Sequence, residues 1–463
     1  MGIPSYFSYL IKHHKAIVKR LTTPVDRLCL DSNSIIYDVV HSLEHPTHDT
    51  IIQGVCKKID SYIQFVKPQK GTYISFDGVP PMAKAHQQRE RRYKGWVLHQ
   101  LMQDTVTWDT VQITPGTEFM HQLDTQVTAY FQGKDCIVST SQEPGEGEHK
   151  IMDYLRGLKD ESIIIYGLDA DLILLGMLQP LHIELMREAP DFIKVTSHQE
   201  GLLLLDLPLL RSIIEETMSI QDYVFITLLL GNDFMPHFPS LQLRLNGMDV
   251  LLDTYRKLFK KGTHLYDGTI QWNNVRILIQ SLSVHEQTRF QENDKIRKKP
   301  GTDIQDIPRR RREVEIYINP YEAYWEDRYY HRLFYSEPTP EFKKKVVHQY
   351  LEMMAWNMDY YTLGCKHWDM YYSYNYAPLL KDISTYFVDI KMVYSLSSPL
   401  TPSQLLAYVM PRAYLGYLPK EVQKKIKDKW YSNDFSLEWS YCTYLWESHV
   451  HFPCISLKEI KQL

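Results

Sequence analysis

The sequence predicts an α/β protein in which a mostly parallel central sheet is flanked by helices. Apolar runs of strand length alternate with helical patterns over residues 1–285, and acidic residues directly follow several of these runs. This alternation is typical of βαβ units, which gather functional side chains at the carboxyl edge of their parallel strands. With 463 residues, 44% of them hydrophobic, the chain is also long enough to bury a sizeable core.

The elements of this first section can be placed in chain order. The predicted strands are short apolar runs at residues 27–30, 72–76, 135–140 and 162–168. The predicted helices lie between them, at residues 51–66, 84–103 and 147–158. Because each helical pattern separates two strands, we expect each helix to connect its strands and to cover the sheet.

Beyond residue 285 the pattern changes twice. Residues 286–314 are charge-dense, contain two prolines and lack apolar periodicity, so we expect a linker or mobile loop there. Residues 315–463 are rich in Tyr and Trp, and the run 343–361 has helical spacing. We therefore expect a mainly helical, aromatic-rich second region that packs against the first section and helps to wall its site.

Composition excludes several classes of protein. A formal net charge of −4 argues against wholesale coating of nucleic acid, so such binding would need a local basic site. Six cysteines without CxxC spacing argue against a disulfide framework and a zinc site. No stretch is long enough to span a membrane, and the amino terminus has no signal-type apolar core.

These features favour a monomer in a reducing compartment, without membrane contact. We expect the cytoplasm. The nucleus is the alternative, because the basic residues at 297–299 and 309–312 resemble a bipartite nuclear signal, although a solvated linker explains the same charges.

Five acidic islands lie in the first section. Their carboxylates are Asp31, Asp77, Glu146, Glu148, Asp169, Asp171 and Asp233. Because several follow predicted strands, they would meet at one sheet edge, where crowded carboxylates need cations. Oxygen ligands without a His or Cys cluster suit Mg²⁺, or Mn²⁺, rather than zinc. Two such ions about 3.5–4 Å apart are the usual arrangement for attack of water on a phosphodiester.

Several islands also have an ordinary structural explanation. Asp31 in isolation is a helix cap, and Glu146 and Glu148 are favoured at a helix start by the helix dipole. Asp169 and Asp171 are harder to explain, because residues i and i+2 of an extended segment point the same way and repel each other. Taken together in α/β order, the islands favour a metal site.

A basic helix face follows the second island. Lys84, Gln88, Arg91 and Arg92 fall at i, i+4, i+7 and i+8 of one predicted helix, so they share a face. A terminal 5′-phosphate needs more donors than an internal diester, and a lysine, an amide and two arginines form a compact cup for it. An isolated basic run is more often a solvated helix face. Because this helix face lies next to the acids, we favour the phosphate cup. The bound 5′ end would then lie within one nucleotide of the metals.

These motifs resemble those of the 5′→3′ exoribonucleases of the Xrn type. The segments similar to family motifs are MGIPSYFSYL, LDSNSII, FDGVPPMAKAHQQRERR, EPGEGEHKIMDYLR, GLDADLILL and LLGNDFMPH. The likeness continues through residues 343–378 and LWESHVHFPCISLKEI, and it thins in the charged stretch and around 405–435. It therefore spans nearly all of the chain.

The resemblance implies a PIN-like 5′-nuclease domain at 1–285, a linker, and a second conserved region at 315–463 that completes the active-site wall. It implies two Mg²⁺ ions at the seven acids and 5′-monophosphate recognition by the basic helix face. It also implies base stacking, here by Tyr37 in place of a family His and by Trp368, whereas Met370 replaces a second Trp. The long C-terminal extension of large members is absent, so the chain resembles a catalytic core.

The implied substrate is single-stranded RNA with a 5′-monophosphate, degraded processively to 5′-mononucleotides in mRNA decay, with a decapping enzyme as a partner that supplies the ends. Two other functions stay open. A flap-type 5′ nuclease shares the acidic order, although no helix-hairpin-helix is evident. A non-catalytic module that binds RNA 5′ ends is the other, although the complete acidic set argues against it. No residue is identifiable as a reader of the 2′-hydroxyl that separates RNA from DNA.

Overall fold

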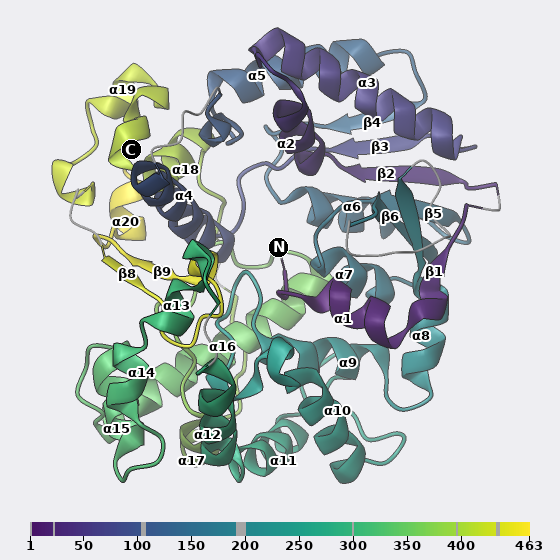
Figure 1. Cartoon of the computed structure of the whole chain (residues 1–463). Coiled ribbons are helices and arrows are strands. Elements are labelled where there is room, and N and C mark those ends of the chain that lie inside the picture. The colour runs from purple at the N-terminus through teal and green to yellow at the C-terminus, as the bar shows by residue number, and fades with distance from the viewer. Residues whose placement is uncertain are drawn as a thin grey trace.

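The central sheet of the first section confirms the α/β prediction (Figure 1). The computed structural model describes residues 2–21, 24–102, 108–190, 201–298, 301–394, 397–431 and 436–463. Within them the main sheet has seven strands in the order β1-β7-β6-β5-β2-β3-β4. They are β1 (Val18–Lys19), β2 (Arg27–Asp31), β3 (Thr72–Ser75), β4 (Cys136–Ser139), β5 (Ser162–Tyr166), β6 (His182–Glu188) and β7 (Leu202–Asp206). Strands β2 to β6 are mutually parallel, whereas β1 and β7 form antiparallel pairs.

The predicted strands correspond to β2, β3, β4 and β5, with ends that differ by one or two residues. Strands β1, β6 and β7 were not predicted. The β7 run LLLLD shows why, because a short, fully apolar segment has no alternation that distinguishes a buried strand from a buried helix.

Helices cover both faces of the sheet, and alternate residues of the strands point to opposite cores. Leu28 and Leu30 of β2 belong to one core and Cys29 to the other. The first core lies under α2 (Asn33–Ser42), α3 (His48–Val66) and α5 (Glu118–Phe131), at the top of Figure 1. The second lies under α1 (Tyr6–His13), α6 (Gly147–Leu155), α7 (Asp171–Leu178), α8 (Leu207–Glu215) and α9 (Ile220–Thr227).

The aromatic-rich second region extends this second core, as expected for a region that packs against the first. Its longest helix, α16 (Pro340–Leu363), is buried along most of its length and packs against α7. The other elements beyond α9 are α10 (Gly247–Leu258), α11 (Trp272–Ser283), α12 (Glu286–Arg297), α13 (Ile307–Arg310), α14 (Glu313–Ile318), α15 (Trp325–Leu333), α17 (Leu380–Tyr386), α18 (Pro402–Val409), α19 (Lys420–Gln423), α20 (Leu457–Ile460), β8 (Ser436–Glu438) and β9 (His449–His451). Across the described ranges, none of the helices combines the length and the apolar content that crossing a bilayer requires.

The basic helix α4 (Met82–Met102) lies against the C-terminal part of the chain (Figure 1). The predicted end at residue 103 falls outside the described residues. Arg89 anchors the helix, because its Nη2 donates to the carbonyl oxygens of Pro453 at 3.0 Å and Trp430 at 3.4 Å. Its guanidinium also lies 4.2 Å from the ring centre of Phe452. The position of α4 therefore depends on residues more than 300 positions away in the sequence.

The charged stretch is not a linker in its described part. Helices α12 and α13 occupy most of it, and Phe290 of α12 is 2% exposed with its ring 4.8 Å from that of Trp325. Arg297 and Arg312 are buried and both pair with Glu315, at 2.7 Å. The charge pattern was misleading because these helices bury charges in ion pairs instead of presenting an apolar stripe.

Glu286 at the start of α12 makes the stability of the fold depend on pH. Its carboxylate accepts the backbone N–H groups of Leu380 at 2.8 Å and Lys381 at 3.0 Å, yet burial raises its pKa to about 7. An unfolded Glu titrates near pH ~4.3, so the stabilising contribution is complete below that pH and is lost as the pH rises to about 7. Urea unfolding of Glu286→Gln should show a flatter pH dependence between these values, and an unchanged slope would contradict the assignment.

Candidate metal and phosphate site

Asp31 and Asp77 lie at the carboxyl ends of neighbouring strands, as the sequence predicted. Asp31 is the last residue of β2, and Asp77 follows the end of β3 by two residues. The backbone N–H of Gly147, at the start of α6, donates to Asp77 Oδ1 at 2.7 Å. A Cβ on Gly147 would lie only 2.6 Å from Asp31 Oδ1, so this position must be small. Asn33 holds Asp77 from the other side, donating from Nδ2 to Oδ2 at 2.8 Å.

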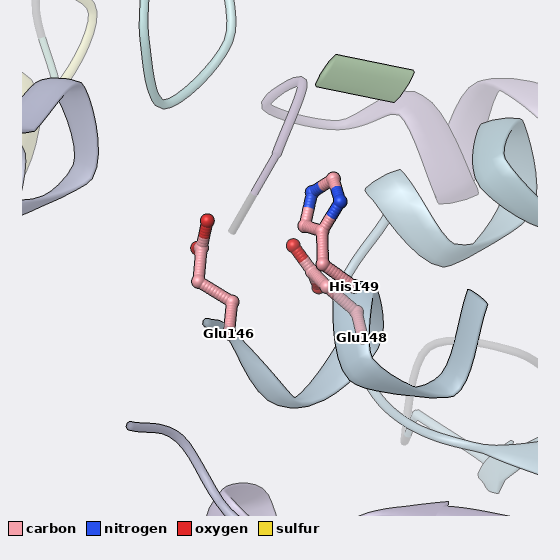
Figure 2. Close-up of side chains that lie close together, drawn as sticks. All are labelled: Glu146, Glu148 and His149. Carbon is pink, nitrogen blue, oxygen red and sulfur yellow. The ribbon is translucent and has the colours of Figure 1, made fainter. Parts of the chain in front are cut away.

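Two further pairs of acids begin the helices that follow. Glu146 is the N-cap of α6, Glu148 lies in its first turn, and the two carboxyl groups point the same way (Figure 2). Asp171 is the first residue of α7 and Asp169 lies in the turn before it, so the extended segment inferred from the sequence is wrong. The four acids of these two pairs nonetheless lie close together. Burial and the charges of Glu146, Asp169 and Asp171 raise the pKa of Glu148 well above its ordinary range.

Desolvation and repulsion keep Asp31 and Asp171 from ionising easily, whereas nearby positive charge lowers the pKa of Asp169 and of Asp233. Burial, Asp77 and Asp169 raise the pKa of Asp31 well above its ordinary value. Burial and Asp233 raise the pKa of Asp171 to about 7. Groups shifted in this direction gain from a neighbouring cation.

Lys84 supplies one positive charge to the cluster. Its Nζ lies 2.6 Å from Glu146 Oε2 and 2.7 Å from Asp233 Oδ2. Burial alone would lower its pKa, but Asp233 and Glu146 raise the pKa well above the ordinary lysine value. The sequence placed Lys84 in the phosphate cup, whereas in the structure its amine is held between two of the acids.

Unpartnered ligand atoms remain beside this pairing. Glu148 Oε1 and Asp171 Oδ1 are buried without a hydrogen-bond partner among the described residues. Glu146, Glu148 and His149 offer ligand atoms within 4.8 Å of one another (Figure 2), and His149 Nε2 is likewise buried and unpartnered. His149 was not among the residues that the sequence indicated. The donors are still mainly carboxylates, so the residues fit a divalent cation.

One cavity of about 230 Å³ joins the acids to the basic helix face. Its acidic wall comprises Asp31, Asp77, Glu146, Glu148 and Asp169. Its other wall comprises Lys84, Gln88, Arg91 and Arg92 of α4, and Tyr37 also lines it. Five of the seven predicted acids and the four predicted cup residues thus line one space, whereas Asp171 and Asp233 do not belong to its described lining.

The arginines in this cavity lack acidic partners among their described contacts. Arg92 donates from Nη2 to Thr114 Oγ1 at 2.7 Å and from Nη1 to the backbone oxygen of Gln88 at 3.2 Å, and its buried Nε has no partner. Burial and the neighbouring Arg91 lower the pKa of Arg92 to about 10. Arg91 stays accessible to solvent. A buried guanidinium next to a second one favours an anion in the cavity.

Trp368 is placed differently from Tyr37. It does not belong to the described lining of the cavity. Its backbone oxygen accepts the N–H of Met82 at the start of α4, at 2.8 Å. The structure therefore brings Tyr37 to the acids and the basic face, and leaves Trp368 beside the helix start.

Two tyrosines of α16 contact the site without having been predicted. Tyr360 donates to Glu146 Oε1 at 2.8 Å, and its ring stacks on His149 with centroids 3.7 Å apart. Tyr361 accepts from Nδ2 of Asn232, next to Asp233, at 3.3 Å. Tyrosines in a helical run indicate core packing, and no local signal links Tyr360 to an acid 214 residues away. The second region therefore holds two of the acidic loops.

Comparisons with known proteins agree with this arrangement. Residues 1–189 match the family model "XRN 5'-3' exonuclease N-terminus", and residues 214–317 and 311–462 match "Xrn1 helical domain". The 5'-3' exoribonuclease 2 homolog of Caenorhabditis elegans is 24% identical over 98% of this chain and 70% of its own length. The 5'-3' exoribonuclease 1 of Homo sapiens is 25% identical over 99% of this chain and 34% of its own length.

Among solved structures, the catalytic core of Rad2 in complex with DNA substrate aligns with 55% of this chain and 66% of its own at 15% identity, with a TM-score of 0.33. The family models carry the assignment, because together they span nearly the whole sequence. The chain belongs to the XRN family of 5'-3' exonucleases.

Proposed function

We propose that the chain is a Mg²⁺-dependent 5′→3′ exoribonuclease that degrades single-stranded RNA bearing a 5′-monophosphate to 5′-mononucleotides. One observation carries the proposal, namely a cavity in which buried carboxylates face guanidinium groups that have no acidic partner in the described part of the chain. Membership of the XRN family supports the direction of attack. The names of the relatives support RNA as the substrate.

The basic face of α4 binds the terminal phosphate. A 5′-monophosphate carries close to two charges at neutral pH, so it matches two adjacent guanidinium groups better than an internal diester does. Arg92 and Gln88 are buried and held by their own contacts, which gives the cup a defined shape. Tyr37 lines the same cavity and stacks on the first base.

The seven acids hold two Mg²⁺ ions, with Glu148 and Asp171 contributing the oxygens that lack other partners. When bound, the ions supply a water of lowered pKa and a Lewis acid for the departing 3′-oxygen. Lys84 keeps Glu146 and Asp233 oriented, Tyr360 fixes Glu146 from behind, and Asn33 fixes Asp77. The acids therefore need little rearrangement to receive cations.

The chemistry of the substrate places the enzyme downstream of a reaction that exposes 5′-monophosphates. Cap removal is such a reaction, so a decapping enzyme is the partner class we propose. Stacking at Tyr37 together with a closed phosphate cup favours processive action, because the new end enters the same cup after each cut. The six cysteines are free thiols, which suits the cytoplasm.

The test is digestion of one end-labelled RNA carrying a 5′-monophosphate, a 5′-triphosphate or a 5′-hydroxyl, with Mg²⁺ or with EDTA. We expect rapid release of mononucleotides from the monophosphate alone, and only with Mg²⁺. Cleavage within a branched duplex would instead indicate a flap-type nuclease. If the protein bound the monophosphate end without hydrolysing the RNA, the non-catalytic module that binds RNA 5′ ends would be the remaining function.

Arg91→Ala should reduce the preference of the enzyme for 5′-monophosphate RNA over 5′-hydroxyl RNA, measured as the ratio of their digestion rates. A charge-assisted contact contributes on the order of 1.5–3 kcal/mol, so digestion of monophosphate RNA should slow roughly tenfold to a hundredfold. The slow hydroxyl substrate should hardly change. Lys57→Ala, which removes an exposed cation from α3, is the matched control. Equal slowing of both substrates would show that Arg91 contacts the backbone in general, and the end-reading role would be abandoned.

A further inference from the structure

A second cavity lies against another face of α4. It has a volume of about 190 Å³, and Gln87, Glu90 and Lys94 line it at i, i+3 and i+7 of the helix. The spacing puts these residues on a different stripe from the phosphate cup. Asp233 also lines this cavity and is bonded through Lys84 to Glu146, which lines the first one. The two cavities therefore adjoin across the acidic cluster.

The charges in the second cavity are balanced. Glu90 lies 3.8 Å from His449, and the His449 contact, Lys94 and His86 lower the pKa of Glu90 to about 2 although its burial alone would raise it. Glu447 pairs with Arg244. Such walls offer no surplus of positive charge to a phosphate, in contrast to the cup with its two arginines.

The polar groups of this cavity suit the edges of bases. Amides of Gln87, Gln242 and Asn375 line it, and an amide can both donate and accept hydrogen bonds. Within the described ranges, Gln87 Oε1 and His237 Nε2 are buried without hydrogen-bond partners. Burial lowers the pKa of His237 to about 4, so its ring is neutral at physiological pH. Unsatisfied, uncharged acceptors and donors match an uncharged polar ligand.

An aromatic platform stands at the edge of the cavity. Tyr444 and Trp446 stack with centroids 6.1 Å apart and an interplanar angle of 15°, and Trp446 is 41% exposed. The guanidinium of Arg244 lies 5.1 Å from the Tyr444 ring centre and 5.7 Å from that of Trp446. Lys94 ties the platform to α4 by donating to the backbone oxygen of Trp446 at 3.2 Å. Exposed stacked rings beside a cation are the usual sequence-tolerant surface for unpaired bases.

We propose that the second cavity and the Tyr444–Trp446 platform bind unpaired bases of the incoming strand, on the 3′ side of the bond that is cut. The inference rests on the proposed function, since it takes a single-stranded nucleic acid as the substrate. A strand whose terminal phosphate occupies the arginine cup passes the acids and continues past Asp233, where the base-binding walls begin. The phosphate cup selects the 5′ end, and the Tyr444–Trp446 platform binds the strand on the 3′ side of that end.

Binding measured in EDTA, where the strand stays intact, tests the proposal. Fluorescence anisotropy compares 5′-monophosphorylated RNAs of two nucleotides and of about twelve, within the length range that such surfaces cover. In the wild-type protein the longer RNA should bind more tightly. Trp446→Ala should weaken the longer RNA about tenfold and leave the dinucleotide nearly unchanged, because one lost stacking contact corresponds to that factor.

Matched variants separate stacking from folding. Trp446→Phe keeps a ring and should retain most of the affinity, whereas Tyr324→Ala, which removes a 77% exposed ring elsewhere on the surface, should have no effect. With the unaltered protein, 2-aminopurine placed at successive positions should be quenched at a position behind the first nucleotide. If Trp446→Ala bound both RNAs with the same affinity as the wild type, the proposal would be overturned. It would also be overturned if the fluorescence of 2-aminopurine were quenched at no position behind the first nucleotide.

Two further outcomes are distinguishable. Binding of a free mononucleotide that depends on Trp446 would assign the cavity to the released product and would also overturn the strand assignment. RNA bound through Trp446 but never hydrolysed with Mg²⁺ would refute the proposed function and leave this inference standing.

Discussion

Asp171→Asn and Glu148→Gln are expected to abolish hydrolysis while the protein stays folded. Each change removes a charge from a buried oxygen that has no other partner and that we assign to the cations. Losing one preorganised electrostatic contact at a reacting centre typically slows the chemical step about 10²–10³-fold, and losing a ligand should cost at least as much. Single-turnover digestion of 5′-monophosphate RNA with Mg²⁺ measures the effect.

Glu143→Gln is the matched control, because Glu143 lies exposed in the loop before α6 and its carboxylate accepts a hydrogen bond from Ser139. It should digest RNA at the wild-type rate. Metal binding gives a second readout that does not depend on activity. A ligand at about 100 times its Kd stabilises a protein by about 2.7 kcal/mol, so saturating Mg²⁺ should raise the Tm of the wild type and of Glu143→Gln but not that of Asp171→Asn. A wild-type rate in either acidic-site variant would refute the metal assignment.

Glu315→Ala is expected to cause a large loss of stability. The carboxylate pairs with Arg297 and Arg312 and accepts the backbone N–H of Tyr441 at 2.8 Å. Removing it leaves two buried guanidinium groups without their common partner, a change that costs about 3–5 kcal/mol. Urea unfolding should show the midpoint falling accordingly.

The neighbouring Glu313 provides the comparison. It pairs with Arg311 at 3.4 Å, but both side chains are exposed, so Glu313→Ala should change the unfolding free energy by no more than about 1 kcal/mol. Deletion of residues 293–312, which the charge pattern alone would suggest is harmless, should destabilise the fold through the same lost pairs. Similar midpoints for Glu315→Ala and Glu313→Ala would show that the buried network contributes little.

Most of the first domain could be predicted from local patterns. Strands β2 to β5 are short apolar runs separated by helical periodicity, and that periodicity reports which faces are buried. Strand β7 and helix α12 could not be predicted, for different reasons. The β7 run is uniformly apolar, and α12 buries Glu286 and Arg297 among partners that lie far away in the chain.

The acids of the site were predictable because of a geometric rule. Parallel strands end at one edge, so Asp31 and Asp77 had to be neighbours once β2 and β3 paired in parallel. The partner of Lys84 was not predictable, because Asp233 lies 149 residues away and no spacing links them. His149 was overlooked because its ring was not expected to turn toward Glu146 and Glu148.

The sequence by itself determined the fold class, the acidic and basic residues that line the first cavity, and the face of α4 that they occupy. These properties follow from short-range periodicity, which repeats within a few residues. Only the tertiary structure decided that Lys84 faces the acids, that Tyr360 holds Glu146, and that a second cavity adjoins the first. Ion pairs and cavities arise where distant segments exclude water together, and the free energy of that desolvation depends on three-dimensional neighbours that no local pattern encodes.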